Sequence, residues 1–280
     1  MLPKPILDIH THLGKIFRAH PRLSARGLLR KMDSLGIDMA VVLAIENPEE
    51  TDYYFPTESV LRATRKYRDR LIPFCNVDPR RGHPKTFDPY PIIERYVARG
   101  CRGFGEELAG LFVDDERLQR IYRAVAELGI PILLHLDGYR NIDDVGLPRF
   151  ERMIREHKRT IFIAHGPHWW AEISGDVKPE DVNRYPKGPV KPGGKVEYLL
   201  QKYPNVYGDL SAGSGLNALQ RDPEHAKGFL ERNRRKLLFG TDIIWETQEI
   251  KTLEFLEKLE LDENVYRDIL YRNAEKLLKL

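Results

Sequence analysis

The segment Ile6-Leu7-Asp8-Ile9-His10-Thr11-His12 holds the features from which both the fold and the site can be predicted. Its apolar residues form a short run of the kind found in strands that are buried on both faces. The run ends in His10 and His12, and alternate residues of a strand point to the same side. Two imidazoles placed in this way can bind one Zn²⁺-type ion, so we expect both to face the strand end, with Asp8 one step deeper. A pair of surface histidines is the alternative that this segment leaves open.

Seven further apolar runs follow, each four to seven residues long and rich in Ile, Val, Leu or Phe. The eight runs start about 30 residues apart, except for a longer step between the sixth and the seventh. Amphipathic segments between them predict helices over 24–35, 57–68 and 115–128, and Gly36 and Gly129 are typical C-caps for two of these. Strands and helices that alternate at this spacing predict βαβ units. The expected strands are Ile6–His10, Met39–Ile45, Leu71–Val77, Cys101–Phe104, Ile130–His135, Ile161–His165, Val206–Leu210 and Leu237–Gly240.

Eight βαβ-type units close into a (β/α)8 barrel, the TIM barrel, which needs about 250 residues. The chain has 280 residues, so we expect one α/β domain over residues 1–280. A doubly wound sheet is the alternative architecture. Cys75 and Cys101 are too few for a disulfide framework, and we expect both as buried thiols.

Composition and charge argue against several classes of protein. The apolar fraction of 41% is enough for a core, yet no apolar run approaches the roughly 20 residues that cross a bilayer. The N-terminus enters the first strand without a basic segment, a long apolar segment or a cleavage site, so we predict a cytoplasmic protein without a signal peptide. The formal net charge of +3 gives no indication of a nucleic-acid partner, for which we would expect a clustered basic face.

Residues of the metal-ligand type stand at the ends of other expected strands. His135 ends the fifth strand, His165 ends the sixth, and Asp242 follows the eighth. In a closed barrel these ends converge on one axis, at the face where such barrels carry their active sites. Glu106 and Glu107 follow the fourth strand, and alternation lets only one of them point inward; we expect this to be Glu106. Its carboxylate could bridge two ions or accept a hydrogen bond from a ligand histidine.

The 29-residue segment Gly166–Gly194 interrupts the regular spacing and carries five prolines together with Trp169, Trp170 and Tyr185. Long loops in compact domains are usually functional or disordered, and two adjacent tryptophans argue against disorder. The segment follows a strand end, on the face where barrel active sites lie. We therefore predict a lid or specificity loop. A packing loop or a contact within a homo-oligomer is the alternative.

Several short motifs resemble the amidohydrolase superfamily, and most closely its amidohydrolase-related family of TIM-barrel metal-dependent hydrolases. They are DIHTH at 8–12, LLHLD at 133–137, FIAHG at 162–166, FGTD at 239–242, and the ending ILYRNAEKLL at 269–278, which is similar to the family's closing helix. The resemblance implies that His10, His12 and Asp242 bind one metal ion, with His135 as a further ligand. It also implies that His165 binds a second ion or acts as a catalytic acid and base.

The fourth strand departs from the pattern of many two-metal members of that superfamily, which carry a carboxylated lysine there. This sequence has no lysine at that place. Glu106 resembles instead the glutamate of the TatD-like and some phosphotriesterase-like branches. The resemblance therefore implies a divalent metal, with Zn²⁺ as the first choice, and leaves open one or two ions per chain.

The expected ligand set predicts hydrolysis. A metal with an open position lowers the pKa of bound water from 15.7 to about 7 and polarises a carbonyl or phosphoryl oxygen. Asp242, at the edge of the metal, would take the proton of the water and pass it to the leaving group. We predict hydrolysis of an amide, ester, lactone or phosphoester bond in a small molecule. The alternatives are a non-oxidative decarboxylase of an aromatic or unsaturated acid, a TatD-like nuclease, and a binding barrel without enzymatic activity.

Substrate-binding residues are expected on the loops at the strand ends. Trp169 and Trp170 would form a wall for an apolar or planar substrate, and His168 would hydrogen-bond to it. Arg140 would hold a carboxylate or a phosphate, and solvated loop charge is an equal alternative. The polar residues after the seventh strand, which either bind substrate or cap the next helix, are Asp209, Ser211 and Ser214.

Overall fold

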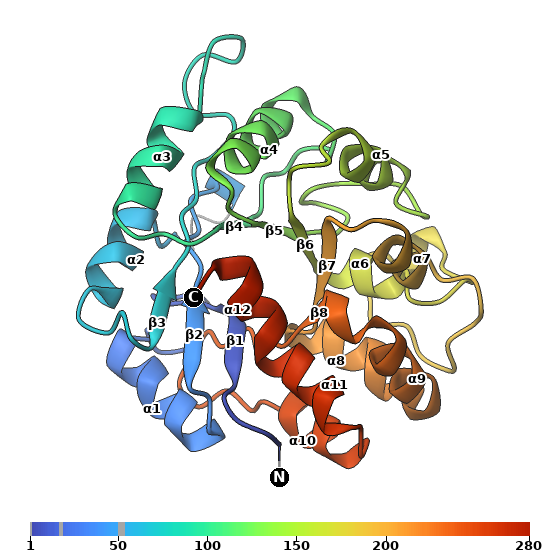
Figure 1. Ribbon diagram of the computed structural model, residues 1–280. Helices are drawn as coiled ribbons and strands as arrows, with labels where there is room; N and C mark the ends of the chain where they lie inside the picture. The colour runs from blue at the N-terminus through green and yellow to red at the C-terminus, as the bar shows by residue number, and fades with distance from the viewer. Residues whose placement is uncertain (1, 17–18, 50–53) are drawn as a thin grey trace.

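The structure is a computed structural model that describes residues 2–16, 19–49 and 54–280. Eight parallel strands form a ring, and helices encircle it (Figure 1). The first three strands pair in sequence order, and so do the other five. The strands are β1 (Leu7–Thr11), β2 (Met39–Val42), β3 (Leu71–Pro73), β4 (Phe104–Glu107), β5 (Ile132–His135), β6 (Phe162–His165), β7 (Val206–Asp209) and β8 (Leu237–Leu238).

Single parallel bridges join the two groups of strands into a closed barrel. Cys75 pairs with Phe104 between β3 and β4, and Thr11 pairs with Ile243 between β1 and the end of β8. All eight expected strands are present, and the predicted TIM barrel is confirmed. The fourth strand begins at Phe104, where the expected one ends, because the preceding residues lead into the barrel as a loop.

The helices lie outside the ring, and their ends show ordinary capping chemistry. α1 (Ala25–Leu35) begins after Ser24, whose side chain caps the first turn, and ends at Gly36 in the left-handed conformation. α4 (Glu116–Leu128) ends in the same way at Gly129, as the sequence predicts. No helix in the described part of the chain is long and apolar enough to span a membrane. The other helical segments are α2 (Thr57–Thr64), α3 (Tyr90–Ala98), α5 (Pro148–Glu156), α6 (Pro167–Ala171), η2 (Pro179–Asp181), α7 (Lys195–Lys202), α8 (Ala212–Gln220), α9 (Pro223–Asn233), η3 (Arg234–Lys236), α10 (Thr252–Lys258), α11 (Glu263–Arg267), η4 (Asp268–Arg272) and α12 (Asn273–Leu278).

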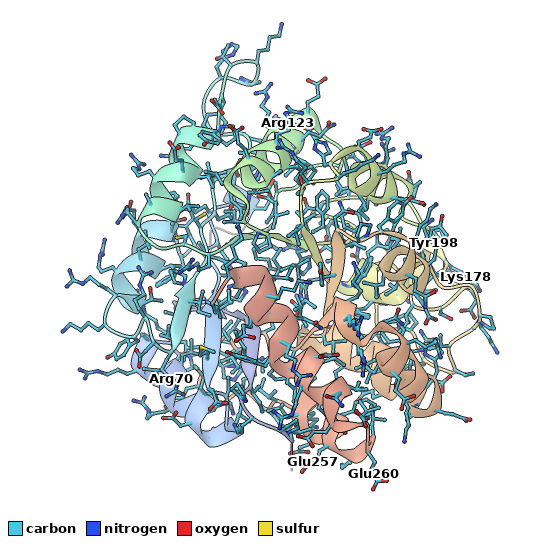
Figure 2. All side chains as sticks on the ribbon, in the orientation of Figure 1. Arg70, Arg123, Lys178, Tyr198, Glu257 and Glu260 are labelled. Atoms are coloured by element: carbon cyan, nitrogen blue, oxygen red, sulfur yellow. The ribbon has the colours of Figure 1, made fainter. Side chains whose placement is uncertain are left out.

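Apolar side chains fill the barrel, so the ring encloses a packed core (Figure 2). One buried cluster contains Ile9, Val41 and residues of the other strands, and α12 joins it through Leu277. Lys279, next to α12, donates from Nζ to Gly129 O, which lies just before β5, at 2.8 Å. α12 therefore covers the N-terminal ends of the strands, and the C-terminal ends remain for a site.

A register shift in β1 turns its histidines toward the mouth of the barrel. Leu7 and Ile9 both belong to the inner cluster, so strict alternation would direct His10 outward. The pairing of β1 with β2 shifts between Asp8 and Thr11. Such an irregularity adds one residue and changes the direction of the side chains that follow. The sequence pattern contains no mark of this shift.

Asp8 therefore does not line the site one step below the histidines, as simple alternation predicts. Its Oδ1 accepts hydrogen bonds from His10 N and Thr241 N, both at 3.0 Å, and its Oδ2 accepts one from Thr241 Oγ1 at 2.5 Å. Burial raises the pKa of Asp8 to about 7 against the effect of these bonds. Asp8 ties β1 to the end of β8, and this connection holds the backbone of His10 in place.

The long segment Gly166–Gly194 is held against its neighbours. Gly138 N, after β5, donates to Asn183 Oδ1 at 2.6 Å. Asn217 Nδ2, on α8, donates to Pro186 O at 3.1 Å. The second half of the segment is therefore fixed between the loop after β5 and helix α8.

Candidate active site

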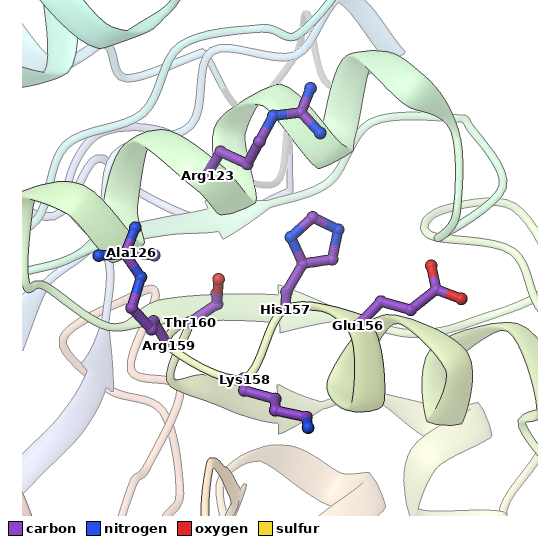
Figure 3. Close-up of a pocket in the computed structure, with 7 residues that line it drawn as sticks. All are labelled: Arg123, Ala126, Glu156, His157, Lys158, Arg159 and Thr160. Carbon is purple, nitrogen blue, oxygen red and sulfur yellow. The ribbon is translucent and has the colours of Figure 1, made fainter.

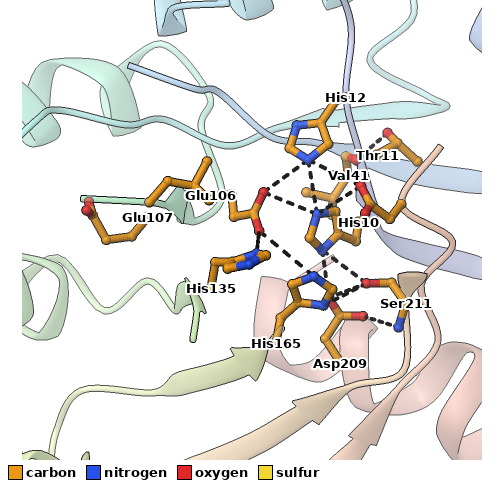
Figure 4. A network of polar contacts seen from close by, with 12 residues as sticks. His10, Thr11, His12, Val41, Glu106, Glu107, His135, His165, Asp209 and Ser211 are labelled. Carbon is orange, nitrogen blue, oxygen red and sulfur yellow. Dashed lines mark hydrogen bonds and ion pairs between the residues drawn. The ribbon is translucent and has the colours of Figure 1, made fainter. Parts of the chain in front are cut away.

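Four donor atoms from three strand ends meet at the C-terminal mouth of the barrel (Figure 4). His10 Nε2 and His12 Nε2 lie 3.0 Å apart. Asp242 Oδ1 lies 3.5 Å from the first and 3.6 Å from the second. Glu106 Oε2 lies 3.5 Å from His10 Nε2 and 3.2 Å from His12 Nε2. A tetrahedral ion with ligands at about 2.0–2.1 Å sets its ligand atoms about 3.3–3.4 Å apart, so His10, His12 and Asp242 fit one divalent ion, and Glu106 lies beside the two histidines.

A second register shift, in β4, turns Glu106 toward these histidines. The pairing of β4 with β5 shifts between Phe104 and Glu107. Glu107 faces away from the site, its Oε1 accepts a hydrogen bond from Ala109 N at 2.8 Å, and burial raises its pKa to about 8. Of the two neighbouring glutamates, the structure thus places Glu106 against the histidines.

A second group of donors shares His10 with the first. His10, Glu106 and His165 also lie close enough together to hold an ion. However, His10 Nδ1 lies 2.7 Å from Asp209 Oδ2, so Nε2 is the nitrogen of this ring that remains for a metal. A ring nitrogen offers one lone pair and therefore binds one ion. The two groups cannot both be complete, and the arrangement favours one ion over two.

Asp209 and Ser211 hold the histidines from behind, a role that the sequence left undecided. Asp209 is fully buried at the end of β7, and its Oδ2 lies 3.3 Å from His165 Nδ1 as well as against His10. Ser211 Oγ donates to Asp209 Oδ2 at 2.8 Å and lies 3.0 Å from His165 Nδ1. A carboxylate in this place fixes the orientation of a ligand histidine and raises its basicity. In the sequence, Asp209 is only a polar residue at the end of a strand, and this position does not indicate that its partners are histidines.

The buried carboxylates of the site face the histidines, which shift their pKa values. Burial alone would lower the pKa of His10, but Glu106, Asp242 and Asp209 raise it well above its usual value. Burial would raise the pKa of Glu106, yet the facing histidines hold it well below its usual value. His10 and His165 do the same to the pKa of Asp209. Buried carboxylates need a positive partner, and a divalent ion on the histidines would satisfy the same groups.

His135 lies beside the donor group, and its role as a further ligand stays a prediction. Its Nδ1 lies 2.8 Å from Glu106 Oε1, and its Nε2 lies 3.2 Å from Asp137 Oδ2. Burial alone would lower the pKa of His135, but the bonds to these two carboxylates raise it to about 9. Arg140 Nη1 donates to Asp137 Oδ2 at 2.8 Å. Arg140 is therefore linked to the site through Asp137, and it shares its charge with that carboxylate.

Trp169 and Trp170 are core residues, and their predicted role as a substrate wall is wrong. Their exposed fractions are 0% and 2%, and both rings pack in the apolar layer between the barrel and its helices. Trp170 Nε1 donates to Asp209 O at 2.9 Å. His168, which was expected to touch substrate, is also fully buried, with Nε2 3.4 Å from Glu172 Oε1. Helix α6 turns these side chains inward, where large rings gain most from burial.

Replacing Trp170 by Phe should lower the free energy of unfolding by about 1–3 kcal/mol more than replacing Trp169 by Phe. Both changes remove the same ring volume. Only Trp170 donates a hydrogen bond, to Asp209 O, whereas Trp169 Nε1 has no partner among the described residues. Urea unfolding of both variants measures the difference. Equal losses would show that the bond to the Asp209 carbonyl adds nothing to stability.

Tyr185 is the aromatic residue that brings the long segment to the mouth. Its ring lies against Gly213 at the start of α8, where an added Cβ would be 3.0 Å from the Tyr185 hydroxyl. Burial and the charge of Asp242 raise the pKa of Tyr185, and 47% of the residue remains exposed. Tyr185 therefore supports the prediction of a specificity loop, whereas the buried tryptophans do not.

An apolar rim accompanies the polar site, and no pattern in the sequence indicates it. Ile16, Ile45, Leu108 and Ile244 form a separate buried cluster, and Trp245 packs against it. These residues come from the loops after β1, β2, β4 and β8, and two of these loops also carry the donors His12 and Asp242. Single apolar residues in loops gave no signal that they would meet in space.

The comparison with protein families decides which family this barrel represents. The sequence matches the amidohydrolase family model over residues 7–280, from the first strand to the end of the chain. The chain belongs to the amidohydrolase family. This amidohydrolase is therefore an enzyme, and its strand ends carry the histidines and acidic residues that the family resemblance implied. The search of curated proteins finds no match.

Solved structures share the fold of this amidohydrolase at low sequence identity. One is a probable 2-pyrone-4,6-dicarboxylic acid hydrolase from Acinetobacter baumannii with citric acid bound, with 16% identity, a TM-score of 0.64, and coverage of 98% of this chain and 99% of that one. Another is the 5-carboxyvanillate decarboxylase of Novosphingobium aromaticivorans with manganese, with 16% identity, a TM-score of 0.63, and coverage of 98% and 96%. A third is an amidohydrolase from Burkholderia multivorans with bound zinc, with 15% identity, a TM-score of 0.63, and coverage of 98% and 99%.

Proposed function

We propose that this amidohydrolase binds one divalent metal ion, best fitted by Zn²⁺, and hydrolyses an amide, ester, lactone or phosphoester bond of a small molecule. The observation that carries the proposal is the set of His10 Nε2, His12 Nε2 and Asp242 Oδ1, which lie 3.0 to 3.6 Å apart. Imidazole and carboxylate donors suit zinc. The zinc and manganese in structures of the same fold support a divalent ion.

Asp242 is the residue we assign to proton transfer. When bound, the ion would act as a Lewis acid and supply a water with a pKa near 7. Asp242 turns Oδ1 toward the two histidines, and its side chain is 25% exposed, whereas that of Glu106 is 6% exposed. Its second carboxylate oxygen is therefore able to accept a proton from water at the mouth and return it to the leaving group.

His165 is assigned to the charge that develops on the substrate oxygen. Its Nδ1 is held by Ser211 and Asp209, which leaves Nε2, 4.0 Å from Glu106 Oε1, turned toward the site. A fixed N–H at this place would donate to an oxygen that gains negative charge in the transition state. We do not assign His165 to a second ion. Both candidate groups need His10 Nε2, and this nitrogen can bind only one ion.

The rim supports a small substrate with an apolar body. Ile45, Leu108 and Ile244 lie in the loops that surround the donors, and Tyr185 adds an aromatic ring with a polar hydroxyl. Such a lining, with a few polar groups that fix orientation, is typical of small-molecule sites. Arg140 is the nearest assigned cation for a carboxylate of the substrate, although Asp137 already pairs with it.

The proposed function is tested with Zn²⁺-loaded protein on a panel of lactones, esters, amides and phosphoesters. We expect at least one compound to be hydrolysed, the activity to be lost on removal of the metal by a chelator, and Zn²⁺ to restore it. A hydrolytic activity that persists in metal-free protein would contradict the proposal.

Decarboxylation is the second candidate, because the same fold holds manganese in a 5-carboxyvanillate decarboxylase and because Arg140 stands near the mouth as a partner for an acid. Aromatic acids are therefore part of the same panel. Metal-dependent release of CO₂ from one of them, without hydrolysis of any other compound, would replace the first proposal by the second.

A further inference from the structure

The charges of this chain are separated between the two ends of the barrel. Segments 65–70, 99–102, 156–160 and 234–236 lead from helices into β3, β4, β6 and β8, so they lie at the N-terminal ends of the strands. Together they carry eleven Lys or Arg residues and two acidic residues. The chain as a whole has a net charge of +3, so the remainder has a net charge of −6. The face opposite the candidate active site is thus strongly basic, although the total charge hides it.

Many of these cations are not used inside the protein. Arg65, Arg102, Lys158, Arg159 and Arg235 are exposed, and among the residues that the structure describes none of their side chains has an ion-pair or hydrogen-bond partner. Others are used: Arg68, for example, donates to the carbonyls of Arg99 and Gly100. These five exposed cations without partners are the side chains that a bound anion would contact first.

Hollows lined by these cations open on the face and its rim. Four of them have volumes of about 330, 270, 310 and 660 Å³, and each is lined by at least two Lys or Arg residues. Figure 3 shows the first, where Arg123 of α4 and Lys158 and Arg159 of the loop before β6 surround the hollow. The largest of the four is lined by Arg62, Arg65, Arg68 and Arg99, and by Glu58, which pairs with Arg99. Several separate cationic hollows suit one extended anion better than one small ligand.

The helix dipoles explain only part of this charge. Helices of a TIM barrel end at this face, and cations near a helix C-terminus are stabilised by about half a negative charge per helix. About eight helix ends would therefore balance about four positive charges. The four segments have a net charge of +9, so an excess remains after this balance.

We propose that this basic face binds the phosphate backbone of a nucleic acid. Arginine dominates the hollows, and its planar guanidinium pairs with phosphate in a bidentate manner. Large apolar side chains, which would insert into a lipid surface, are scarce here. Of the seven exposed ones in the described part of the chain, five follow the C-terminal ends of strands, namely Tyr54, Phe112, Tyr139, Val145 and Tyr185. Tyr198 lies on helix α7, and Leu280 remains at the basic end. Aromatic platforms for bases are scarce there too, so the recognition is independent of sequence.

The test compares two variants with the same change in total charge. The face variant combines Arg65→Glu, Arg102→Glu, Arg159→Glu and Arg235→Glu. The control variant combines Arg22→Glu, Lys178→Glu, Lys191→Glu and Lys251→Glu, which are exposed and lie in segments that follow β1, β6 and β8. Fluorescence anisotropy with a short labelled DNA duplex measures affinity as a function of salt, and circular dichroism establishes that both variants are folded.

We expect wild type to bind the duplex in the micromolar range at about 50 mM salt and to weaken steeply toward about 200 mM. The face variant should lose at least tenfold in affinity, and its salt slope should fall by about three to four, because each lost phosphate contact removes about 0.9. The control variant should keep the slope of wild type. Equal losses in both variants, no binding by wild type, or binding only to anionic lipid vesicles run in parallel would each overturn the proposal.

Discussion

Replacing Asp242 by Asn should lower kcat by about 10²- to 10⁴-fold at saturating Zn²⁺, with the protein still folded. Asn keeps the size of the side chain and an oxygen that can face His10 and His12, but it cannot accept a proton. The carboxylate is the most exposed member of the donor set, at 25% of its side chain. The effect should therefore fall on the chemical step and be visible as a loss of kcat with little change in KM.

Glu246→Gln is the matched control for this prediction. Glu246 lies four residues further along the same loop and pairs with Arg30 on the surface. Its replacement should change kcat by no more than about twofold, as for other surface substitutions. If Asp242→Asn retains nearly full kcat while metal is bound, Asp242 is only a ligand, and the proton must be moved by another group.

Replacing Asp209 by Asn should weaken metal affinity by about 10- to 100-fold. Asp209 Oδ2 lies 2.7 Å from His10 Nδ1 and 3.3 Å from His165 Nδ1, so it orients both rings and stabilises the proton that His10 carries on Nδ1. The neutral amide would keep the shape of the side chain but lose the charge. Competition between the protein and a chromogenic zinc chelator measures the change.

Ser214→Ala provides the comparison for Asp209. Ser214 follows the same strand and is buried, but it is not part of the network formed by Asp209, Ser211 and the two histidines. Its replacement should leave the metal affinity unchanged within about twofold. A similar loss in both variants would mean that the loop after β7 acts through general stability and not through the orientation of His10.

The fold was predictable because the strands are short, apolar and evenly spaced. The runs that end at His135 and His165 became β5 and β6 with the predicted C-terminal residues. The convergence of the site followed from the same reasoning, since the C-terminal ends of parallel strands in a barrel meet at one mouth. His10, His12 and Asp242 could therefore be grouped although 230 residues separate the last two.

Other features of the site depend on details that the regular alternation of side chains along a strand does not predict. The register shifts beside His10 and Glu106 decide which side chains face the mouth, and no residue type marks them. Asp209 is a short polar residue at a strand end, equally suited to a helix cap, a substrate contact or a histidine partner. Trp169 and Trp170 lie in a loop-like segment, but the short helix α6 turns them into the core.

The net charge of +3 does not describe how charge is distributed over the molecule. A sum over the chain cannot show that the segments before β3, β4, β6 and β8 are basic while the remainder has a net charge of −6. The sequence did contain the information, because the segments before β3, β4, β6 and β8 can be located once the strands are known. The expectation of no nucleic-acid partner stays a prediction, and the duplex experiment decides it.

The proposed function depends on one divalent ion held by His10, His12 and Asp242, with Glu106 beside it. The most direct test is the metal content per chain after loading with Zn²⁺ and removal of the excess, in wild type, in Glu106→Gln and in a double variant with His10→Asn and His12→Asn. We predict about one zinc per chain in wild type, about one in Glu106→Gln with weaker retention, and none in the double variant. Two ions in wild type with one lost in Glu106→Gln, or an unchanged metal content in the double variant, would contradict the account.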